Sequence, residues 1–244
     1  MSRPPEHIPA DSSALFLDVD GTLVDIEDDP AAVHADDELL QLLQDAAAKL
    51  DGALALVSGR SLSEIDRMFS SLALPAAGAH GSEIRINGSP IAQQEPPAVP
   101  AAIRRDAERF VADRDGLLLE QKTNGFSLHY RRAPALADDS RDYVSSLLAR
   151  LGEDFRLIEG KMVLEIAPRS HSKGEAIRVL LDQAPFRNRV PVFVGDDVTD
   201  EDGFRAANEY GGLSVCVGDR RDSDAHYRLP DVAAVRRWLG AAIA

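Results

Sequence analysis

The chain has 244 residues, a length that fits one large domain or two modest ones. Its 44% of apolar residues can build a core, while its formal charge of −14 argues against general binding to nucleic acid or anionic membranes, which carry the same sign of charge. The single cysteine, Cys216, leaves no partner for an intrachain disulfide and is expected to be a small buried strand residue. Residues 1–13 lack the apolar segment of a secretory signal, and no apolar run is long enough to span a bilayer, so we expect a cytoplasmic protein.

The N-terminal part of the chain alternates short apolar runs with helical patterns. Residues 14–17 are predicted to form a buried strand that ends at Asp18. Residues 37–50 are predicted to form a helix, because their leucines and alanines recur on one helical face. Residues 53–57 form a second predicted strand, and Ser61 with Glu64 is a capping box that opens another helix.

The pattern changes between about residue 91 and residue 168. The predicted strands here are amphipathic and alternate with two helical patterns, after a proline-rich linker over residues 94–100. The helices are predicted over residues 101–113 and 138–151, and the strands over residues 116–121, 126–132, 155–159 and 162–167. This order predicts an antiparallel α+β domain over residues 93–168, inserted into a core formed by residues 1–92 and 169–244.

The C-terminal part returns to the first pattern. It contains, in order, a predicted helix, strand, helix and strand, over residues 172–184, 191–194, 204–208 and 213–217. Apart from Ser214, the strands of both outer parts are apolar, which is typical of a parallel sheet buried on both faces. The predicted fold class is therefore α/β, with an α+β insert.

Two carboxylates, Asp18 and Asp20, directly follow the first predicted strand, and open parallel sheets bind their ligands at the carboxyl ends of strands. Carboxylates this close repel one another unless a cation joins them, and Mg²⁺ prefers carboxylate and phosphate oxygens. Gly21 and Thr22 allow the chain to turn immediately afterwards. Solvated acids in a simple turn are the alternative interpretation.

Two further clusters suit an anion. Ser58, Gly59 and Arg60 offer a hydroxyl and backbone N–H groups at the end of the second strand, although a plain strand-to-helix turn has the same appearance. Lys173 lies at a predicted helix start, where its positive charge is unfavourable next to the helix dipole unless an anion binds there. A solvated lysine on the surface is the alternative interpretation.

A fourth cluster follows the strand at residues 191–194. Asp196, Asp197 and Asp200 offer carboxylates to the same cation. The segment also reads as an acidic helix N-terminus with Thr199 and Asp200 as caps, and both interpretations can hold together.

The ordered set of the four clusters resembles the haloacid dehalogenase superfamily of phosphotransferases. That resemblance implies a Rossmann-like core sheet, and it makes the insert a type 2 cap domain for sugar recognition. Residues 78–85, 122–131, 159–166 and 195–201 also resemble the trehalose-6-phosphate phosphatase family, and the similarity covers nearly the whole chain after residue 13. This second resemblance implies hydrolysis of trehalose 6-phosphate to trehalose and phosphate, the last step of trehalose biosynthesis.

The resemblance also assigns roles to the core residues. Asp18 is the expected nucleophile, which forms an aspartyl phosphate, and Asp20 is its acid/base partner. Ser58 and Lys173 are expected to hold the phosphoryl oxygens. The expected ligands of Mg²⁺ are Asp18, Asp20 through its main-chain carbonyl, Asp196, Asp197 and Asp200.

Sugar hydroxyls favour carboxylate and ammonium partners, and both types occur in the insert. The candidates for substrate binding there are Lys122, His129, Arg131, Glu159, Lys161 and Glu165, and those in the core are Gly59, Arg60, His80 and Glu83. Solvated charges on an exposed sheet face are the alternative for the insert, as is a satisfied strand histidine for His129. A loop-fixing role is the alternative for His80 and Glu83.

Three competing functions stay open. The first is a capped phosphatase of the same superfamily that acts on sucrose 6-phosphate, mannosylglycerate phosphate or a mononucleotide. A receiver domain also groups aspartates, a hydroxyl and a lysine around Mg²⁺, but it is much shorter and has no insert. The third is a regulatory protein with an inactive phosphatase core. The expected partner is a small-molecule substrate, and a monomer is favoured.

Overall fold

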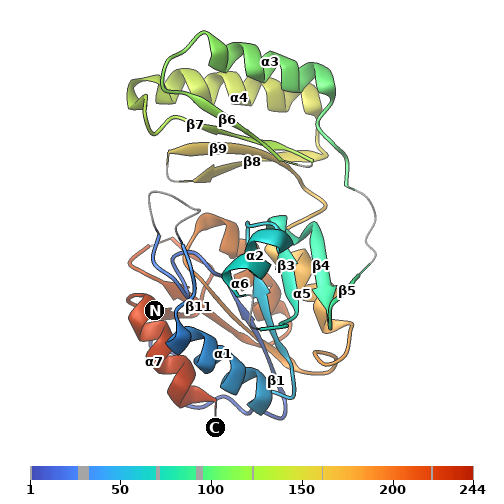
Figure 1. The fold of residues 1–244 in the computed structure, drawn as a ribbon, viewed down its shortest axis with the longest axis vertical. Coiled ribbons are helices and arrows are strands. Elements are labelled where there is room, and N and C mark those ends of the chain that lie inside the picture. The colour runs from blue at the N-terminus through green and yellow to red at the C-terminus, as the bar shows by residue number, and fades with distance from the viewer. Residues whose placement is uncertain are drawn as a thin grey trace. The chain divides into compact units, whose positions relative to one another are not determined.

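The computed structural model describes residues 2–26, 33–69, 72–91, 96–122, 124–160, 162–220 and 222–243. The chain divides into two compact units, which are Met1–Gln93 together with Ser172–Ala244, and Gln94–His171 (Figure 1). The sequence predicts these boundaries at residues 92/93 and 168/169. Residues 169–171 stay with the second unit because the Arg169 N–H donates to the Asp154 carbonyl at 2.8 Å and Arg156 donates to the His171 carbonyl at 3.2 Å.

An eight-stranded sheet forms the centre of the first unit, as far as that unit is described. The strands follow the order β12-β11-β10-β1-β2-β3-β4-β5, and the pairs from β12 to β3 are parallel while β3-β4 and β4-β5 are antiparallel. The bounds are β1 Ser13–Leu17, β2 Leu54–Val57, β3 Ala76–Gly78, β4 Glu83–Ile86, β5 Ser89–Pro90, β10 Val190–Gly195, β11 Leu213–Val217 and β12 Tyr227–Leu229. Every residue of β1 and β2 is buried, because helices cover both faces of the central strands.

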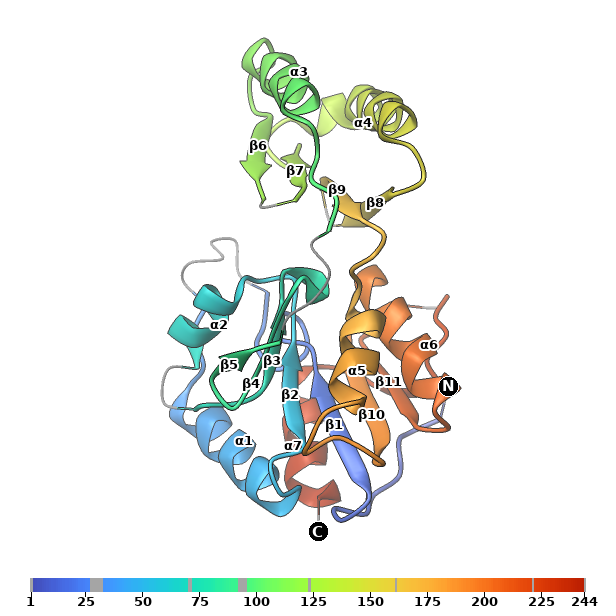
Figure 2. The same cartoon turned by 90° about the vertical axis from the view of Figure 1, so that its right-hand side faces the viewer.

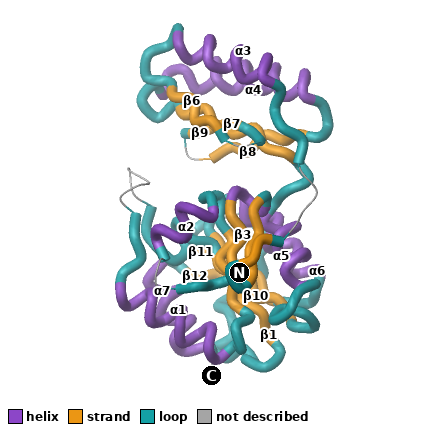
Figure 3. Tube along the Cα trace, turned by 45° about the vertical axis from the view of Figure 1, so that its right-hand side comes forward, coloured by secondary structure: helices purple, strands orange, loops and turns teal. Residues whose placement is uncertain are grey.

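Two helix pairs lie on opposite faces of this sheet. Figures 2 and 3 show α1 on one side and α5 with α6 on the other, and α7 packs beside α1. The helices are α1 Asp37–Lys49, α2 Leu62–Met68, α5 Lys173–Leu181, α6 Glu201–Glu209 and α7 Val232–Ala242, with 3₁₀ turns η1 Ala79–Gly81 and η3 Val198–Asp200. The capping box predicted at Ser61 and Glu64 is confirmed, since each side chain bonds the other's main-chain N–H.

The second unit is a four-stranded antiparallel sheet with helices on one face (Figure 1). The strand order is β6-β7-β9-β8. The elements are α3 Ala101–Ala112, β6 Leu118–Gln121, β7 Phe126–His129, η2 Pro134–Leu136, α4 Ala137–Leu151, β8 Phe155–Gly160 and β9 Val163–Pro168. Phe126, Leu128, Leu164 and Ile166 pack with Val144 of α4 in a core of their own, so the other face of the sheet carries the polar side chains.

No helix among the described residues is long and apolar enough to cross a membrane.

Candidate active site

Three carboxylates converge at the carboxyl edge of the large sheet. Asp18 follows β1 and Asp196 follows β10, and these two strands are parallel neighbours in register, Leu17 opposite Val194. Asp200 comes from η3, one turn later. One carboxylate oxygen from each of Asp18, Asp196 and Asp200 lies within 4.8 Å of the others.

Lys173 pairs with two members of this group. Ser172 caps α5 by accepting a hydrogen bond from the Glu175 N–H, which places Lys173 in the first turn of the helix. The Lys173 Nζ donates to Asp18 Oδ1 and to Asp200 Oδ1, each at 2.6 Å, and its side chain is 3% exposed. The ammonium is therefore buried and paired. The two carboxylates offset its unfavourable interaction with the positive end of the helix dipole.

The group brings three carboxylates together with one ammonium, which pairs with two of them. Burial raises the pKa of the Asp18 carboxyl well above its ordinary value, and Asp200 raises it further, while Lys173 lowers it. Burial also opposes the charge on Lys173, but the two carboxylates outweigh it and raise the pKa of the ammonium. Since hard divalent cations prefer carboxylate oxygens and would favour ionised Asp18, this donor set fits such a cation.

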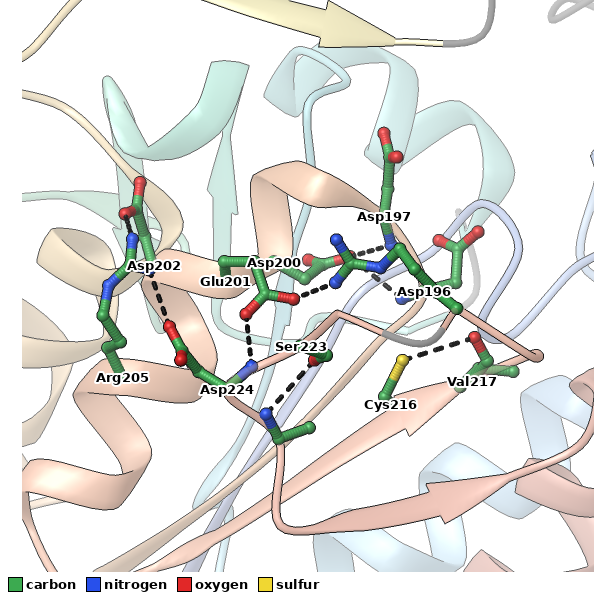
Figure 4. A network of polar contacts seen from close by, with 12 residues as sticks. Asp196, Asp197, Asp200, Glu201, Asp202, Arg205, Cys216, Val217, Ser223 and Asp224 are labelled. Atoms are coloured by element: carbon green, nitrogen blue, oxygen red, sulfur yellow. Dashed lines mark hydrogen bonds and ion pairs between the residues drawn. The ribbon is translucent and has the colours of Figure 1, made fainter. Parts of the chain in front are cut away.

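Asp200 combines the two roles that the sequence leaves open, while Asp197 caps the turn. The Asp200 carboxylate accepts hydrogen bonds from the main-chain N–H groups of Asp196 and Asp197, both at 2.9 Å, so it caps the turn as well as joining the acidic group (Figure 4). Asp197 is the cap residue of η3 and forms a reciprocal capping box with Asp200. Asp197 therefore shapes the loop that presents Asp196.

Thr22, which the sequence predicts only as part of the turn after Asp20, contacts a site residue directly. Its Oγ1 donates to Asp18 Oδ2 at 3.2 Å, in a position that is fully buried. With Lys173 on Oδ1 and Thr22 on Oδ2, the Asp18 carboxylate is held in one orientation. The position of Thr22, four residues after Asp18 in a tight turn, was the available signal.

Asp20 is turned to a different partner. Its Oδ1 accepts from Arg60 Nη2 at 2.6 Å and its Oδ2 accepts from Arg60 Nε at 2.7 Å. The pair is bidentate, and it joins the loops that follow β1 and β2. Arg60, a predicted substrate ligand, thus contacts the predicted acid/base residue.

The residues around Ser58 form a fixed turn. Ser58 follows β2, is buried, and its Oγ accepts from the Arg60 N–H at 3.2 Å. A Cβ at Gly59 would lie 2.6 Å from the His80 ring, so that ring packs where only glycine fits. The Glu83 carboxylate accepts from the Leu62 N–H at 2.8 Å, at the first residue of α2. This contact of Glu83 fixes the turn.

In the second unit, the structure brings together three polar residues. Lys122 Nζ donates to Glu165 Oε2 at 2.9 Å, and Ser127 Oγ donates to the same oxygen at 3.1 Å. Ser127 was not predicted. It lies opposite Glu165 in the β7-β9 register, so the two side chains share the sheet face that the helices do not cover.

Two other predicted residues of the second unit, His129 and Glu159, pair with other side chains. His129 Nε2 lies 2.8 Å from Glu120 Oε2 across the β6-β7 pair, and Arg131 is exposed in the turn after β7. Glu159 lies opposite Leu164 and therefore on the helix side of the sheet, where it pairs with Arg141 of α4 at 2.7 Å. Lys161 lies outside the described residues.

Gly21→Ala is expected to lower kcat/KM by about tenfold or more, because displacing the Asp196 carboxylate would distort the acidic group of the site. Gly21 has a φ of +77°, and a Cβ there would lie 2.3 Å from Asp196 Oδ2. Gly88 is the matched control, with a φ of +75° and no described atom within 4 Å of its Cβ position. Both variants should lose about 1 kcal/mol of stability from the left-handed backbone, but only Gly21→Ala should lose activity. Equal activities of the two variants would contradict the role of Gly21.

Comparison with known proteins gives a consistent result. The family model described as trehalose-phosphatase matches residues 16–233. The chain is 42% identical over 227 residues to the trehalose-6-phosphate phosphatase of Escherichia coli (strain K12), a match that covers 93% of this chain and 85% of the relative. The crystal structure of a trehalose-6-phosphate phosphatase related protein superposes with a TM-score of 0.72 at 28% identity, over 93% of this chain and 95% of that chain.

A more distant structure supports the fold alone. A phosphatase of the haloalkanoate (HAD) enzyme superfamily from Bacteroides thetaiotaomicron is 16% identical and superposes with a TM-score of 0.64, over 94% of this chain and 93% of that chain. The predicted fold class and the resemblance seen in the sequence are both confirmed by these matches.

Proposed function

The chain belongs to the trehalose-phosphatase family, and we propose that it hydrolyses trehalose 6-phosphate to trehalose and phosphate through an aspartyl phosphate on Asp18. The observation that carries this proposal is the group formed by the buried Asp18, Asp200 and Lys173 with the half-buried Asp196. A fixed carboxylate nucleophile, an ammonium and carboxylates for a cation are the parts that phosphoryl transfer requires.

In the first step Asp18 attacks phosphorus in line, so that a bond from Asp18 to phosphorus forms and the bond from phosphorus to the sugar oxygen breaks. Lys173 and Thr22 hold the two Asp18 oxygens and orient the attack. Asp20 gives a proton to the departing sugar oxygen. In the second step Asp20 takes a proton from water, whose oxygen bonds to phosphorus as the bond to Asp18 breaks.

We propose Mg²⁺ as the cation of the acidic group. Asp18, Asp196 and the main-chain carbonyl of Asp20 would hold it, with Asp197 and Asp200 next to it. When bound, it supplies positive charge that offsets the charge of the phosphoryl group and of the carboxylates. Ser58 and Lys173 offer a hydroxyl and an ammonium for the phosphoryl oxygens, with the backbone of Gly59 beside them.

The sugar half of the substrate is assigned to the second unit. Lys122, Ser127 and Glu165 already form a connected polar group on the sheet face that is free of helices, and such groups bind sugar hydroxyls. Further sugar contacts are proposed for His129, Arg131 and Lys161, and core-side contacts for His80 and Glu83, whereas Glu159 lies on the opposite face of the sheet. The cytoplasmic location and the monomeric state remain predictions.

The purified protein should release phosphate from trehalose 6-phosphate in the presence of Mg²⁺, and EDTA should stop the release until Mg²⁺ is added back. The same assay with sucrose 6-phosphate, mannosylglycerate phosphate and a mononucleotide tests the substrate, and kcat/KM should be highest for trehalose 6-phosphate. Faster turnover of another sugar phosphate would overturn the substrate while keeping the reaction. Failure to cleave any phosphate monoester by folded protein would overturn the activity.

A further inference from the structure

Asp20 is held by a single side chain on both of its carboxylate oxygens. The Arg60 guanidinium donates from Nη2 to Oδ1 at 2.6 Å and from Nε to Oδ2 at 2.7 Å. Two parallel hydrogen bonds from a planar fork fix the plane of a carboxylate as well as its position.

The main chain of Arg60 is held by hydrogen bonds, and its side chain is largely buried. Its N–H donates to Ser58 Oγ at 3.2 Å, and its carbonyl accepts from the Ala79 N–H at 2.7 Å. The side chain of Arg60 is 9% exposed, whereas that of Asp20 is 33% exposed. The Arg60 side chain is therefore largely buried, whereas the Asp20 carboxylate that it holds is partly accessible to solvent.

We infer that Arg60 is a positioning residue that acts through Asp20, holding the Asp20 carboxylate in one orientation at the carboxyl edge of the sheet. The inference rests on the proposed function, in which Asp20 exchanges protons with the leaving oxygen and with water. Each carboxylate oxygen that accepts one bond from Arg60 retains another lone pair, so Asp20 can be oriented by Arg60 and still reach a reacting group. Proton transfer depends on such geometry before anything else.

A second bidentate pair in the same unit is the matched control. Arg85 Nη1 and Nη2 donate to the two oxygens of Asp66, both at 2.7 Å, between β4 and α2. Arg85→Gln removes the same kind of fork away from the acidic group, so it reports the effect of losing such a pair on folding alone.

A double-mutant cycle on trehalose 6-phosphate tests the inference. The measured quantity is the rate of sugar release in single turnovers with enzyme in excess, for Asp20→Asn, Arg60→Gln and the double variant. We expect Asp20→Asn to slow release by about 10²-fold or more and Arg60→Gln by on the order of tenfold. Because Arg60 acts through Asp20, the double variant should be within about twofold of Asp20→Asn, and Arg85→Gln should match the wild type.

Two additional measurements separate positioning from a general effect on the site. With p-nitrophenyl phosphate, whose leaving group departs without a proton, Arg60→Gln should slow release by less than about threefold. Arg60→Lys keeps the charge but not the fork, so it should remain clearly slower than wild type on trehalose 6-phosphate. It also provides the test if Arg60→Gln fails to fold.

Additive losses in the cycle would overturn the inference, and so would equal losses on both substrates or full activity of Arg60→Lys. Equal losses would instead assign Arg60 to phosphoryl binding. These results leave the proposed function intact, because the wild type still cleaves its substrate. A wild type that cleaves no phosphate monoester would overturn both.

Discussion

Asp18→Asn should lower kcat on trehalose 6-phosphate by at least about 10⁴-fold, which is the typical order of the loss when a catalytic nucleophile is removed. The amide cannot form the covalent intermediate, but it keeps nearly the volume of the carboxyl. The variant also removes one of the three crowded negative charges, so the fold should survive. Steady-state kinetics together with thermal unfolding measure the two effects.

Asp231→Asn is the matched control for this substitution. Asp231 caps α7 by accepting from the Ala234 N–H at 2.7 Å, and asparagine caps a helix as well as aspartate does. This variant should retain wild-type kinetics. A near-normal rate in Asp18→Asn would show that another residue attacks phosphorus.

Lys173→Met should be the most destabilising of the variants considered, by about 3–5 kcal/mol, because it leaves buried carboxylates without their ammonium. Lys173 bonds Asp18 and Asp200 at 2.6 Å each, and all three side chains are buried. Turnover should also be lost, since the Asp18 oxygen is no longer held and the phosphoryl group loses a donor. Chemical denaturation gives the free energy of unfolding.

The loss of stability in Lys173→Met should depend on pH in a defined direction. Lys173 lowers the pKa of Asp18, which burial and Asp200 raise, so removing it raises the folded-state pKa further. An acid whose folded pKa lies above its unfolded value binds more protons when folded, and stability then falls as pH rises. The deficit relative to wild type should therefore shrink as pH falls through the raised pKa of Asp18.

Arg178→Met is the control on the same helix. Arg178 pairs with Glu209 at 2.6 Å on the surface, where such pairs contribute about 0–1 kcal/mol. If Lys173→Met were no less stable than Arg178→Met at pH values above the raised pKa of Asp18, the buried group of Lys173, Asp18 and Asp200 would not have the stabilising role assigned to it.

The strands at the centre of the large sheet were predictable, because β1, β2, β10 and β11 are predominantly apolar runs. The short strands β3 and β12 were not predicted. Each has three residues, and β3 reads Ala-Ala-Gly, which has little intrinsic preference for a strand. These segments are strands because they pair with neighbouring strands of the sheet. Helix α7 was not predicted, although Asp231 is a suitable N-cap and apolar residues follow it at helical spacing.

The site residues, too, divide into those that could be predicted from the sequence and those that could not. Asp18, Ser58 and Asp196 could be placed from sequence because each directly follows a buried strand, and parallel strands end at one edge. The pairing of Arg60 with Asp20 could not, since it joins residues 40 positions apart through side-chain geometry. The face of Glu159 depends on its register opposite Leu164, which spacing along one strand does not reveal.

The most direct measurement for the central claim is the position of the phosphoryl group in protein quenched with acid during turnover of trehalose 6-phosphate with Mg²⁺. Peptide mass spectrometry of the quenched protein should find the group on Asp18 in the wild type and on no residue in Asp18→Asn. A phosphoryl group on another residue, or turnover by Asp18→Asn at the wild-type rate, would contradict the account.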